Sequence, residues 1–401
     1  MKNILILIFC MLFCGIVNGQ SWAELSSYPD TIDGRNHPVT FALNGFGYVL
    51  TGDGNSGELD DMLKYDPIND TWSVLASFPG GERSYSYGVT SGNKAYVGFG
   101  YNFQVSVGQT YFNDFWEFDG NTETWTQLTS CPCEGRRHPA MVATDSKVFV
   151  GLGSKVNATD LKDWWEYDIS TDTWTQKTDF PSTERHHPYH FSIDNIIYVG
   201  LGHHGASIFN DFYKYDLVAD TWTSIADLPA QGRVAGTQFS LNGKGYILSG
   251  QGENHDNLLT GEFWEYDPIV DAWDSLLPHP GSGRWAPGTF IIDGKVYLTG
   301  GQTLFDERDL WVFDFTPILS NNTIDFENAV IIGPNPGSGL ISIQSEYDIE
   351  QINVYNLVGQ KVLQLVLPRK VADLRLLENG YYILNLHFNG QIVSKKIQII
   401  R

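Results

Sequence analysis

One motif recurs along the chain and limits its fold more than any other feature: an aromatic residue followed by Asp, then Trp seven positions after the ring. A sixth aromatic-Asp pair, Phe313-Asp314, has no following Trp, and Trp22 has no preceding pair. These two halves complete one unit, which predicts that the two ends of the repeat region combine. The five complete copies are Tyr65-Asp66 to Trp72, Phe118-Asp119 to Trp125, Tyr167-Asp168 to Trp174, Tyr215-Asp216 to Trp222 and Tyr266-Asp267 to Trp273.

The Asp residues of the motif recur every 47 to 53 residues, which is close to the period of a four-stranded propeller blade. Within one unit the pattern predicts strands over residues 185–193, 196–202, 212–216 and 221–225, separated by turn residues. Six such units predict an all-β, six-bladed β-propeller over residues 20–317. Pairing of the Trp22 strand with the last blade would close the ring and remove its exposed edges.

Glycines at the end of each second strand carry a family resemblance. Thr299-Gly300-Gly301 has a double glycine, and the other five units have Gly-x-Gly, as in Gly200-Leu201-Gly202. With the aromatic-to-Trp spacing, residues 21–316 resemble the kelch-repeat propellers, a group that includes galactose oxidase-like proteins. Galactose oxidase activity would require a copper site with a cross-linked Tyr-Cys pair, which the cysteine positions here do not support.

Composition excludes several classes of protein. The 401 residues are 42% hydrophobic and 14% aromatic, which excludes a disordered chain. The formal charge is −22, and a surface this acidic repels nucleic acids and anionic lipids. Residues 1–19 have a short basic start, an apolar run and small residues before Gln20, which is typical of a secretory signal peptide. No later segment is long and apolar enough to predict a transmembrane helix.

Cys131 and Cys133 are the cysteines that follow the predicted signal peptide. In an oxidising compartment they would form a small local disulfide; otherwise they remain thiols. Two such ligands without nearby partners do not make a zinc site.

A second domain is predicted at residues 333–401, after a linker at 318–332. Alternating segments indicate strands over 340–344, 349–356, 360–367, 381–388 and 392–400, which fit a small β-sandwich. The segment resembles the type A C-terminal sorting domain of the type IX secretion system of Bacteroidetes. That resemblance implies type IX export machinery as a partner, removal of the sorting domain, and surface anchoring or release. The alternative is an ordinary carbohydrate-binding or immunoglobulin-like appendage. The resemblance rests on Pro334-Asn335-Pro336, Gly339, Val354-Tyr355-Asn356-Leu357, Gly359, Asn379-Gly380-Tyr381-Tyr382, Lys395-Lys396-Ile397 and Arg401.

One face of the propeller is predicted to carry the site, because the loops between second and third strands are long and dissimilar. We call this side, where the connections between blades also emerge, the loop face. A recurring arginine and a recurring acid lie on it, and Arg–carboxylate pairs within or between blades explain a feature present in every unit. These two sets are Arg35, Arg83, Arg136, Arg185, Arg233 and Arg284, and Asp61, Asp114, Asp163, Asp211, Glu262 and Asp309.

Residues that vary between units are the better ligand candidates. Three or more imidazoles near the axis would suit a transition metal, but equal spacing around a ring holds them too far apart unless they point inward. We therefore expect neither a metal nor a cofactor, and a polar cup for a ligand. The candidate ligand-binding residues are Arg35, His37, Arg83, Tyr101, Arg137, His138, His186, His187, His203, His204, His255 and Trp285.

The sequence thus predicts a secreted, monomeric module, surface-anchored or released, that binds a glycan or protein ligand. Aromatic faces stack on sugars, and guanidinium groups bind carboxylates. The alternative is a sugar-active propeller enzyme, since the six-blade layout also resembles bacterial sialic-acid epimerases. Such an enzyme needs an acid or base at the site; Glu184, Glu253 and Glu262 lie in no favourable motif, so catalytic residues stay unassigned.

Overall fold

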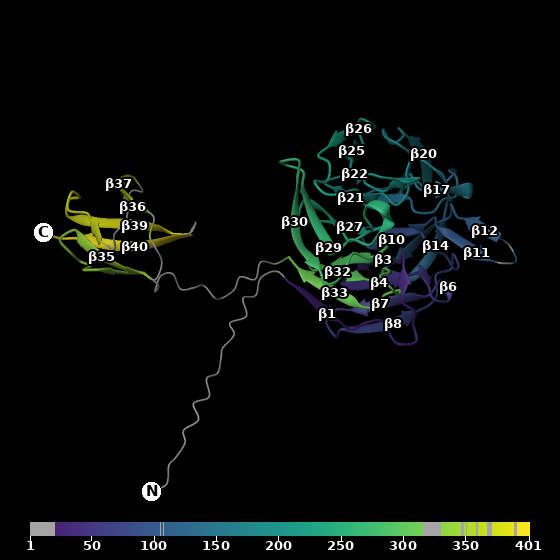
Figure 1. Cartoon of the computed structure of the whole chain (residues 1–401), viewed down its shortest axis with the longest axis horizontal. Coiled ribbons are helices and arrows are strands. Elements are labelled where there is room, and N and C mark those ends of the chain that lie inside the picture. The colour runs from purple at the N-terminus through teal and green to yellow at the C-terminus, as the bar shows by residue number, and fades with distance from the viewer. Residues whose placement is uncertain are drawn as a thin grey trace, which may run out of the picture. The chain divides into compact units, whose positions relative to one another are not determined.

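The computed structural model describes residues 21–104, 106, 108–315, 330–345, 349, 351–357, 360–366, 371–388 and 391–401. The chain divides into two compact units between Pro317 and Ile318, both built from β-strands (Figure 1). In the described part, helix is limited to two short 3₁₀ segments, η1 (Val156–Ala158) and η2 (Glu253–His255). The all-β class is therefore confirmed. None of the described residues belongs to a helix long and apolar enough to cross a bilayer. The predicted signal peptide lies outside them.

The described part of the first unit contains six four-stranded antiparallel sheets. In each, the strands pair in chain order, except that the most N-terminal strand is the outermost strand of the last sheet. The sheets are β3 (Val39–Leu43), β4 (Phe46–Leu50), β7 (Met62–Asp66) and β8 (Thr71–Leu75); β9 (Tyr87–Ser91), β10 (Lys94–Gly98), β13 (Phe115–Asp119) and β14 (Thr124–Leu128); β15 (Ala140–Ala143), β16 (Lys147–Gly151), β19 (Trp164–Asp168) and β20 (Thr173–Lys177); β21 (Tyr189–Ile193), β22 (Ile196–Gly200), β25 (Phe212–Asp216) and β26 (Thr221–Ile225); β27 (Thr237–Leu241), β28 (Lys244–Leu248), β29 (Gly261–Asp267) and β30 (Ala272–His279); and β31 (Gly288–Ile292), β32 (Lys295–Thr299), β33 (Leu310–Asp314) and β1 (Trp22–Leu25).

The first strand of each sheet lies toward the centre of the unit, and the fourth lies at its rim (Figure 1). The predicted strands match the observed ones closely, but the first is shorter. The strand predicted from residue 185 begins at Tyr189 as β21. His187 has a left-handed backbone, with φ of 53°, and Pro188 follows it, so Arg185 to Pro188 forms a separate bend before the strand.

The N-terminal strand β1 pairs with β33, where Trp22 lies opposite Phe313. The Trp22 ring packs against Phe313 and Phe263, with centroids 5.2 Å and 5.9 Å away. A backbone hydrogen bond also joins the last sheet to the first, from Gly301 N–H to the Arg35 carbonyl at 2.8 Å. The equivalent bond joins every other neighbouring pair of sheets, from Gly52 to Arg83, Gly100 to Arg136, Gly153 to Arg185, Gly202 to Arg233 and Gly250 to Arg284.

The repeated aromatic and Trp residues, together with a second Asp two positions before the Trp, hold neighbouring sheets together. In the first sheet Tyr65 lies opposite Trp72, and the Trp72 indole donates a hydrogen bond of 2.7 Å to the Ser26 carbonyl. The Tyr65 hydroxyl donates to Asp70, which also accepts the Ser26 N–H. The same linkage recurs at Trp174, Trp222 and Trp273. The motif that predicts the fold is therefore structural.

Most loops between second and third strands on the loop face carry short strands of their own. In three of these loops the residue after the Gly-x-Gly pairs with the residue after the repeated arginine: Tyr101 with Ser84, Ser154 with Arg137, and His203 with His186. The short strands in these loops are β5 (Asp53–Gly54), β6 (Gly57–Glu58), β11 (Tyr101–Gln104), β12 (Gly108–Tyr111), β17 (Ser154–Lys155), β18 (Thr159–Asp160), β23 (His203–His204) and β24 (Ser207–Ile208). A further short strand, β2 (Arg35–Asn36), precedes β3 and pairs with β5.

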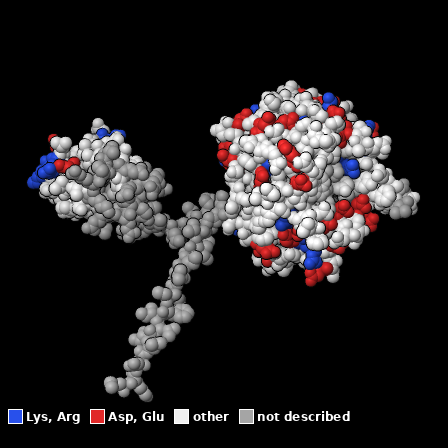
Figure 2. All heavy atoms as spheres, viewed as in Figure 1, with Lys and Arg blue, Asp and Glu red and all other residues white. Residues whose placement is uncertain are grey.

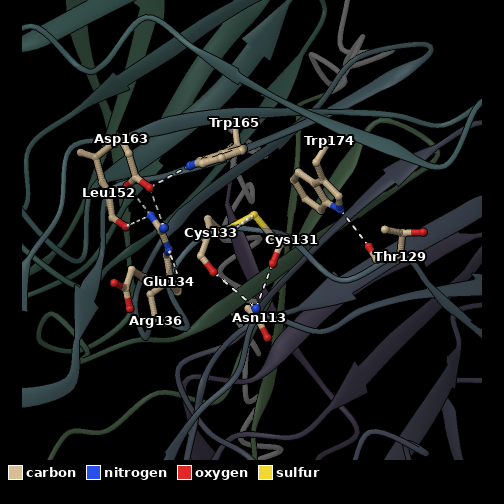
Figure 3. The surroundings of a disulfide bond; sticks show 10 residues. All are labelled: Asn113, Thr129, Cys131, Cys133, Glu134, Arg136, Leu152, Asp163, Trp165 and Trp174. Carbon is tan, nitrogen blue, oxygen red and sulfur yellow. Dashed lines mark hydrogen bonds and ion pairs between the residues drawn. A yellow bond between two sulfur atoms is a disulfide. The ribbon is translucent and has the colours of Figure 1, made fainter.

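Cys131 and Cys133 form a disulfide in the connection between β14 and β15, which selects one of the two states that the sequence left open. Both residues are buried in a core that contains Met141 and Tyr167. Asn113 donates hydrogen bonds to both cysteine carbonyls, at 2.8 Å and 3.3 Å (Figure 3). The disulfide therefore fixes a bend that is also held by hydrogen bonds.

Replacing both cysteines with alanine is expected to lower the free energy of unfolding of the propeller by only about 2 kcal/mol, because the closed loop is very short. Urea unfolding followed by tryptophan fluorescence measures this, since all 12 tryptophans lie between residues 22 and 311. A loss above about 3 kcal/mol, the value for a loop of about 15 residues, would contradict the argument.

The second unit contains two sheets in its described residues. They share one aliphatic core, to which Ile341 and Ile343 contribute from one sheet and Ile352, Leu384 and Ile397 from the other. Strand β34 begins inside the predicted linker, because its apolar residues pair with β35. The sequence pattern also missed the three-residue strand β38. The sheets are β34 (Val330–Gly333), β35 (Leu340–Ser345) and β38 (Val371–Asp373), and β37 (Lys361–Val366), β36 (Gln351–Asn356), β39 (Gly380–Phe388) and β40 (Gln391–Ile399).

Candidate functional site

The repeated arginines are engaged with the repeated acids of their own sheets. Arg136, for example, donates to both oxygens of Asp163 at 2.6 Å and 2.8 Å, and to the Leu152 carbonyl (Figure 3). Arg35 and Arg83, which the sequence also placed among the ligand-binding candidates, are buried and paired in the same way with Asp61 and Asp114. The remaining pairs are Arg185 with Asp211, Arg284 with Asp309, and Arg233 with Glu262 through a single bond.

The residue two positions after each repeated arginine has a left-handed backbone, with φ between 45° and 61° in all six units. We call these the axial positions. Several of their N–H groups bond to the axial carbonyl of the preceding unit, as from His138 to Tyr85 and from His37 to Ala286. This ties the axial residues into a narrow belt, so their side chains are neighbours. The axial residues are His37, Tyr85, His138, His187, Ala235 and Ala286.

Three axial histidines meet in this belt. The Nε2 atoms of His37 and His187 lie 3.1 Å apart. The ring of His138 stacks on His187, with centroids 3.4 Å apart, and lies 5.1 Å from the ring of His37. The three residues are 3–5% exposed. The inward orientation that the sequence argument required for a shared site is therefore present.

Four histidines outside the axial positions, His186, His203, His204 and His255, extend this group. The Nδ1 atom of His187 lies 3.4 Å from Nε2 of His203, and the His203 ring packs on His186 and His255. His204 lies further out and contacts Asp160, with its Nδ1 atom 2.8 Å from a carboxylate oxygen. All seven candidate histidines of the sequence argument thus fall in one continuous group: His37, His138, His186, His187, His203, His204 and His255.

Burial keeps the central imidazoles neutral. It lowers the pKa of His37 to about 3, with a smaller effect of the Arg137 charge. Burial and the neighbouring imidazoles hold the pKa values of His138 and His187 well below the usual range. Burial likewise lowers the pKa of His203 to about 3. At neutral pH each of these rings therefore has one lone pair available.

Asp160 was not predicted from the sequence. Its side chain is buried, and its two oxygens lie 2.8 Å from Nδ1 of His186 and 2.8 Å from Nδ1 of His204. Burial would raise the pKa of Asp160, but hydrogen bonding and charge from these histidines hold it below the usual value. The carboxylate of Asp160 therefore orients His204 through a hydrogen bond and lies in contact with His186.

Arg137 is the arginine of the propeller that has no carboxylate partner among the described residues; every other one forms an ion pair. Its guanidinium lies over the rings of Tyr85 and Tyr101, at 6.0 Å and 5.9 Å. Trp285 packs edge-on against His37 and His187. In the view of Figure 2 the propeller surface is rich in carboxylates. The guanidinium of Arg137, which no carboxylate among the described residues neutralises, is therefore a positive group on a mostly acidic protein.

A cavity of about 310 Å³ adjoins this group along the axis. The first strands of all six sheets line it, and polar side chains include Thr40, His190, Gln238 and Thr289. Its size is at the lower end of the range for small-molecule sites. The sequence argument expected a polar cup but did not name Thr40, Gln238 or Thr289 in its lining, because the residues that form this cavity come from six separate units.

The structure thus brings together His37, Tyr101, Arg137, His138, His186, His187, His203, His204, His255 and Trp285. The sequence reasoning missed Tyr85 and Asp160. Tyr85 could have been found by aligning the repeats on their arginines, because it occupies the same position as His37. Asp160 lies in a loop unlike the others, and no such signal exists for it.

Comparison with known proteins identifies the fold. The family model described as the Attractin/LZTR1 beta-propeller matches residues 47–311, more than half of the chain. The chain belongs to this beta-propeller family. In this family member a second model, the secretion system C-terminal sorting domain, matches residues 332–400. Both resemblances drawn from the sequence, to kelch-type propellers and to the type IX sorting domain, are confirmed. The sorting tail indicates a secreted or cell-surface protein.

Among curated proteins, this beta-propeller is similar to N-acetylneuraminate epimerases. Those of Escherichia coli (strain K12) and Shigella boydii serotype 4 (strain Sb227) are both 33% identical to it over 74 residues, or 18% of this chain. The matched segment spans 20% of each epimerase. The likeness is therefore local.

Proposed function

We propose that this protein is a closed six-bladed propeller, displayed or released outside the cell, that binds a carboxylate-bearing glycan or peptide on its loop face. The observation that carries the proposal is Arg137, a guanidinium with no internal ion-pair partner in the described propeller, placed beside aromatic rings. The pairing of β1 with β33 and the bond from Gly301 to Arg35 support a closed ring.

The chemistry of the loop face suits such a ligand. A guanidinium binds a carboxylate through two parallel hydrogen bonds, which also fix its orientation. Tyr101 is partly exposed and offers a ring face for stacking on a sugar or peptide. The other propeller arginines are neutralised by carboxylates, so Arg137 supplies the local positive charge that an acidic ligand needs.

Replacing Arg137 with glutamine is expected to weaken binding about 10- to 100-fold, the equivalent of one charge-assisted hydrogen bond. The measurement is an array of uronic-acid, sialylated and neutral glycans and acidic peptides, followed by titration calorimetry of the best ligand. Arg308→Gln is the matched control, because Arg308 is an exposed arginine paired with Asp30. Equal binding by both variants and the unaltered chain, or binding of no array member, would refute the proposal.

A second candidate, a sugar isomerase, is favoured by the match to N-acetylneuraminate epimerases and by the hydrogen bond of 2.8 Å between Asp160 and Nδ1 of His204. A carboxylate that orients an imidazole is a common arrangement for proton transfer. Of the three acids considered from the sequence, Glu262 is paired with Arg233, Glu184 lies 4.0 Å from His204, and Glu253 begins η2.

This alternative has a direct test. Proton NMR would follow the α-to-β conversion of N-acetylneuraminate with the unaltered chain and with Asp160→Asn. Acceleration that Asp160→Asn removes would support the isomerase over a binding module. A conversion rate equal to that without protein would exclude this substrate for the isomerase.

A further inference from the structure

His138 is the one axial histidine whose ring nitrogens both lack a partner. Neither Nδ1 nor Nε2 has a hydrogen bond, although both atoms are buried and the residue is only 4% exposed. Leaving a buried polar atom unpaired costs about 1–3 kcal/mol. Such an atom in a native protein calls for a water or an ion that satisfies it.

The orientation of His37 is fixed by its neighbours. The Asn36 amide donates to Asp306 at 2.8 Å, which turns the Asn36 carbonyl oxygen toward Nδ1 of His37 at 2.6 Å. Nδ1 of His37 therefore carries the proton, and its Nε2 lone pair faces His187. Polar atoms that orient an imidazole in this way are the usual outer partners of metal-binding histidines.

We infer that His37, His138 and His187 bind a divalent transition-metal ion, of the class that includes Zn²⁺ and Cu²⁺. One ring nitrogen from each residue lies within 4.8 Å of the others, and three imidazoles are a ligand set that both ions accept. An ion there would leave a coordination position open for a water or for an anionic ligand.

Binding requires a small rearrangement. An ion with bonds of about 2.0–2.1 Å draws its nitrogens to roughly 3.4 Å from one another. His37 and His187 already meet this spacing, at 3.1 Å between their Nε2 atoms. His138 must turn away from the face of His187, on which it now stacks. Its lack of hydrogen bonds means that this rotation breaks none.

Two neighbouring features work against a bound ion and determine which variant tests the site. The Arg137 charge lies near the site and disfavours a dication. In addition, a chain of hydrogen bonds from His203 through His187 to His37 gives a partner to both ring nitrogens of His187 and of His37 without an ion. That chain leaves His138 unexplained, so the decisive variant is His138.

The experiment uses the full chain, purified without a polyhistidine tag, stripped with a chelator and dialysed. Zn²⁺ or Cu²⁺ alone is then titrated by calorimetry, and bound metal is counted by elemental analysis. We expect one ion per chain. His138→Ala and His37→Ala are expected to weaken binding by more than about 100-fold, beyond the 10- to 100-fold loss expected for Asn36→Ala. Circular dichroism checks that each variant folds. If His138→Ala does not fold, His138→Gln is measured in its place.

His190→Ala is the matched control, because His190 is a buried histidine whose ring nitrogens already contact Pro188 and Gln238. It should keep the affinity of the unaltered chain. The inference is overturned if the unaltered chain takes up neither ion, or if the His138 variants bind as tightly as His190→Ala. Arg137→Gln should retain the metal while it loses the acidic ligand, so failure of the metal site and failure of the proposed function give different results.

Discussion

Replacing Arg136 with alanine is expected to lower the free energy of unfolding of the propeller by about 3–5 kcal/mol, because it leaves the Asp163 carboxylate largely buried and unpaired. Arg136 is fully buried and bonds to both Asp163 oxygens and to the Leu152 carbonyl. Tryptophan fluorescence during urea unfolding measures the change. A loss below about 1 kcal/mol would contradict the structural role of the repeated pairs.

The matched control is Arg308→Ala, which removes an ion pair with Asp30 that lies at the surface. Exposed pairs contribute little, so this variant should unfold close to the unaltered chain. A pH series gives a second readout. Burial would raise the pKa of Asp163, but Arg136 holds it below the usual value. The pair therefore stabilises the fold above about pH 4 and loses its effect as the pH falls through that lowered pKa.

Deleting residues 21–25 is expected to destabilise the propeller more than any single side-chain change in β1, and to make it self-associate. The deletion removes Trp22, whose loss alone is expected to cost about 3 kcal/mol, and the ladder with β33. It also leaves β33 as an open edge, which is a template for pairing with another chain. Melting temperature and light scattering against concentration measure both effects.

Glu24→Ala is the control for this deletion, because its side chain is exposed on the same strand and packs against nothing in the core. It should melt with the unaltered chain and stay dispersed. An unchanged melting temperature after the deletion would refute the proposed closure of the ring by the N-terminal strand.

Most of the fold could be predicted because each unit repeats the same contacts between residues that are close in sequence. Tyr65, Asp70 and Trp72 are close in sequence and link their sheet to the preceding segment through Ser26, so the spacing alone reveals the arrangement. Strand β34 escaped prediction because its pairing with β35 spans a turn that the alternation pattern does not mark. The start of the first strand at Tyr189 was missed because no residue pattern within a single unit indicates that His187 has a left-handed backbone.

The candidate site was only partly predictable. The histidines and Arg137 were recognised as residues that vary between units, but their distances depend on the axial belt. A metal site was not expected, since histidines spaced around a ring stay apart unless they point inward. The left-handed axial backbone turns them inward, and it brings His37 and His187, 150 residues apart in sequence, to 3.1 Å.

The sequence by itself determined the repeating unit, the pairing of arginines with acids, the all-β class and the sorting tail, because each depends on contacts between residues of one unit or on a local motif. Only the tertiary structure decided which side chains meet at the axis: that Asp160 joins His186 and His204, that Arg137 has no carboxylate partner in the described propeller, and that His138 has no hydrogen bond. Such contacts join residues from different units, and their distances are set by how the sheets pack around one another, which no spacing along the chain encodes.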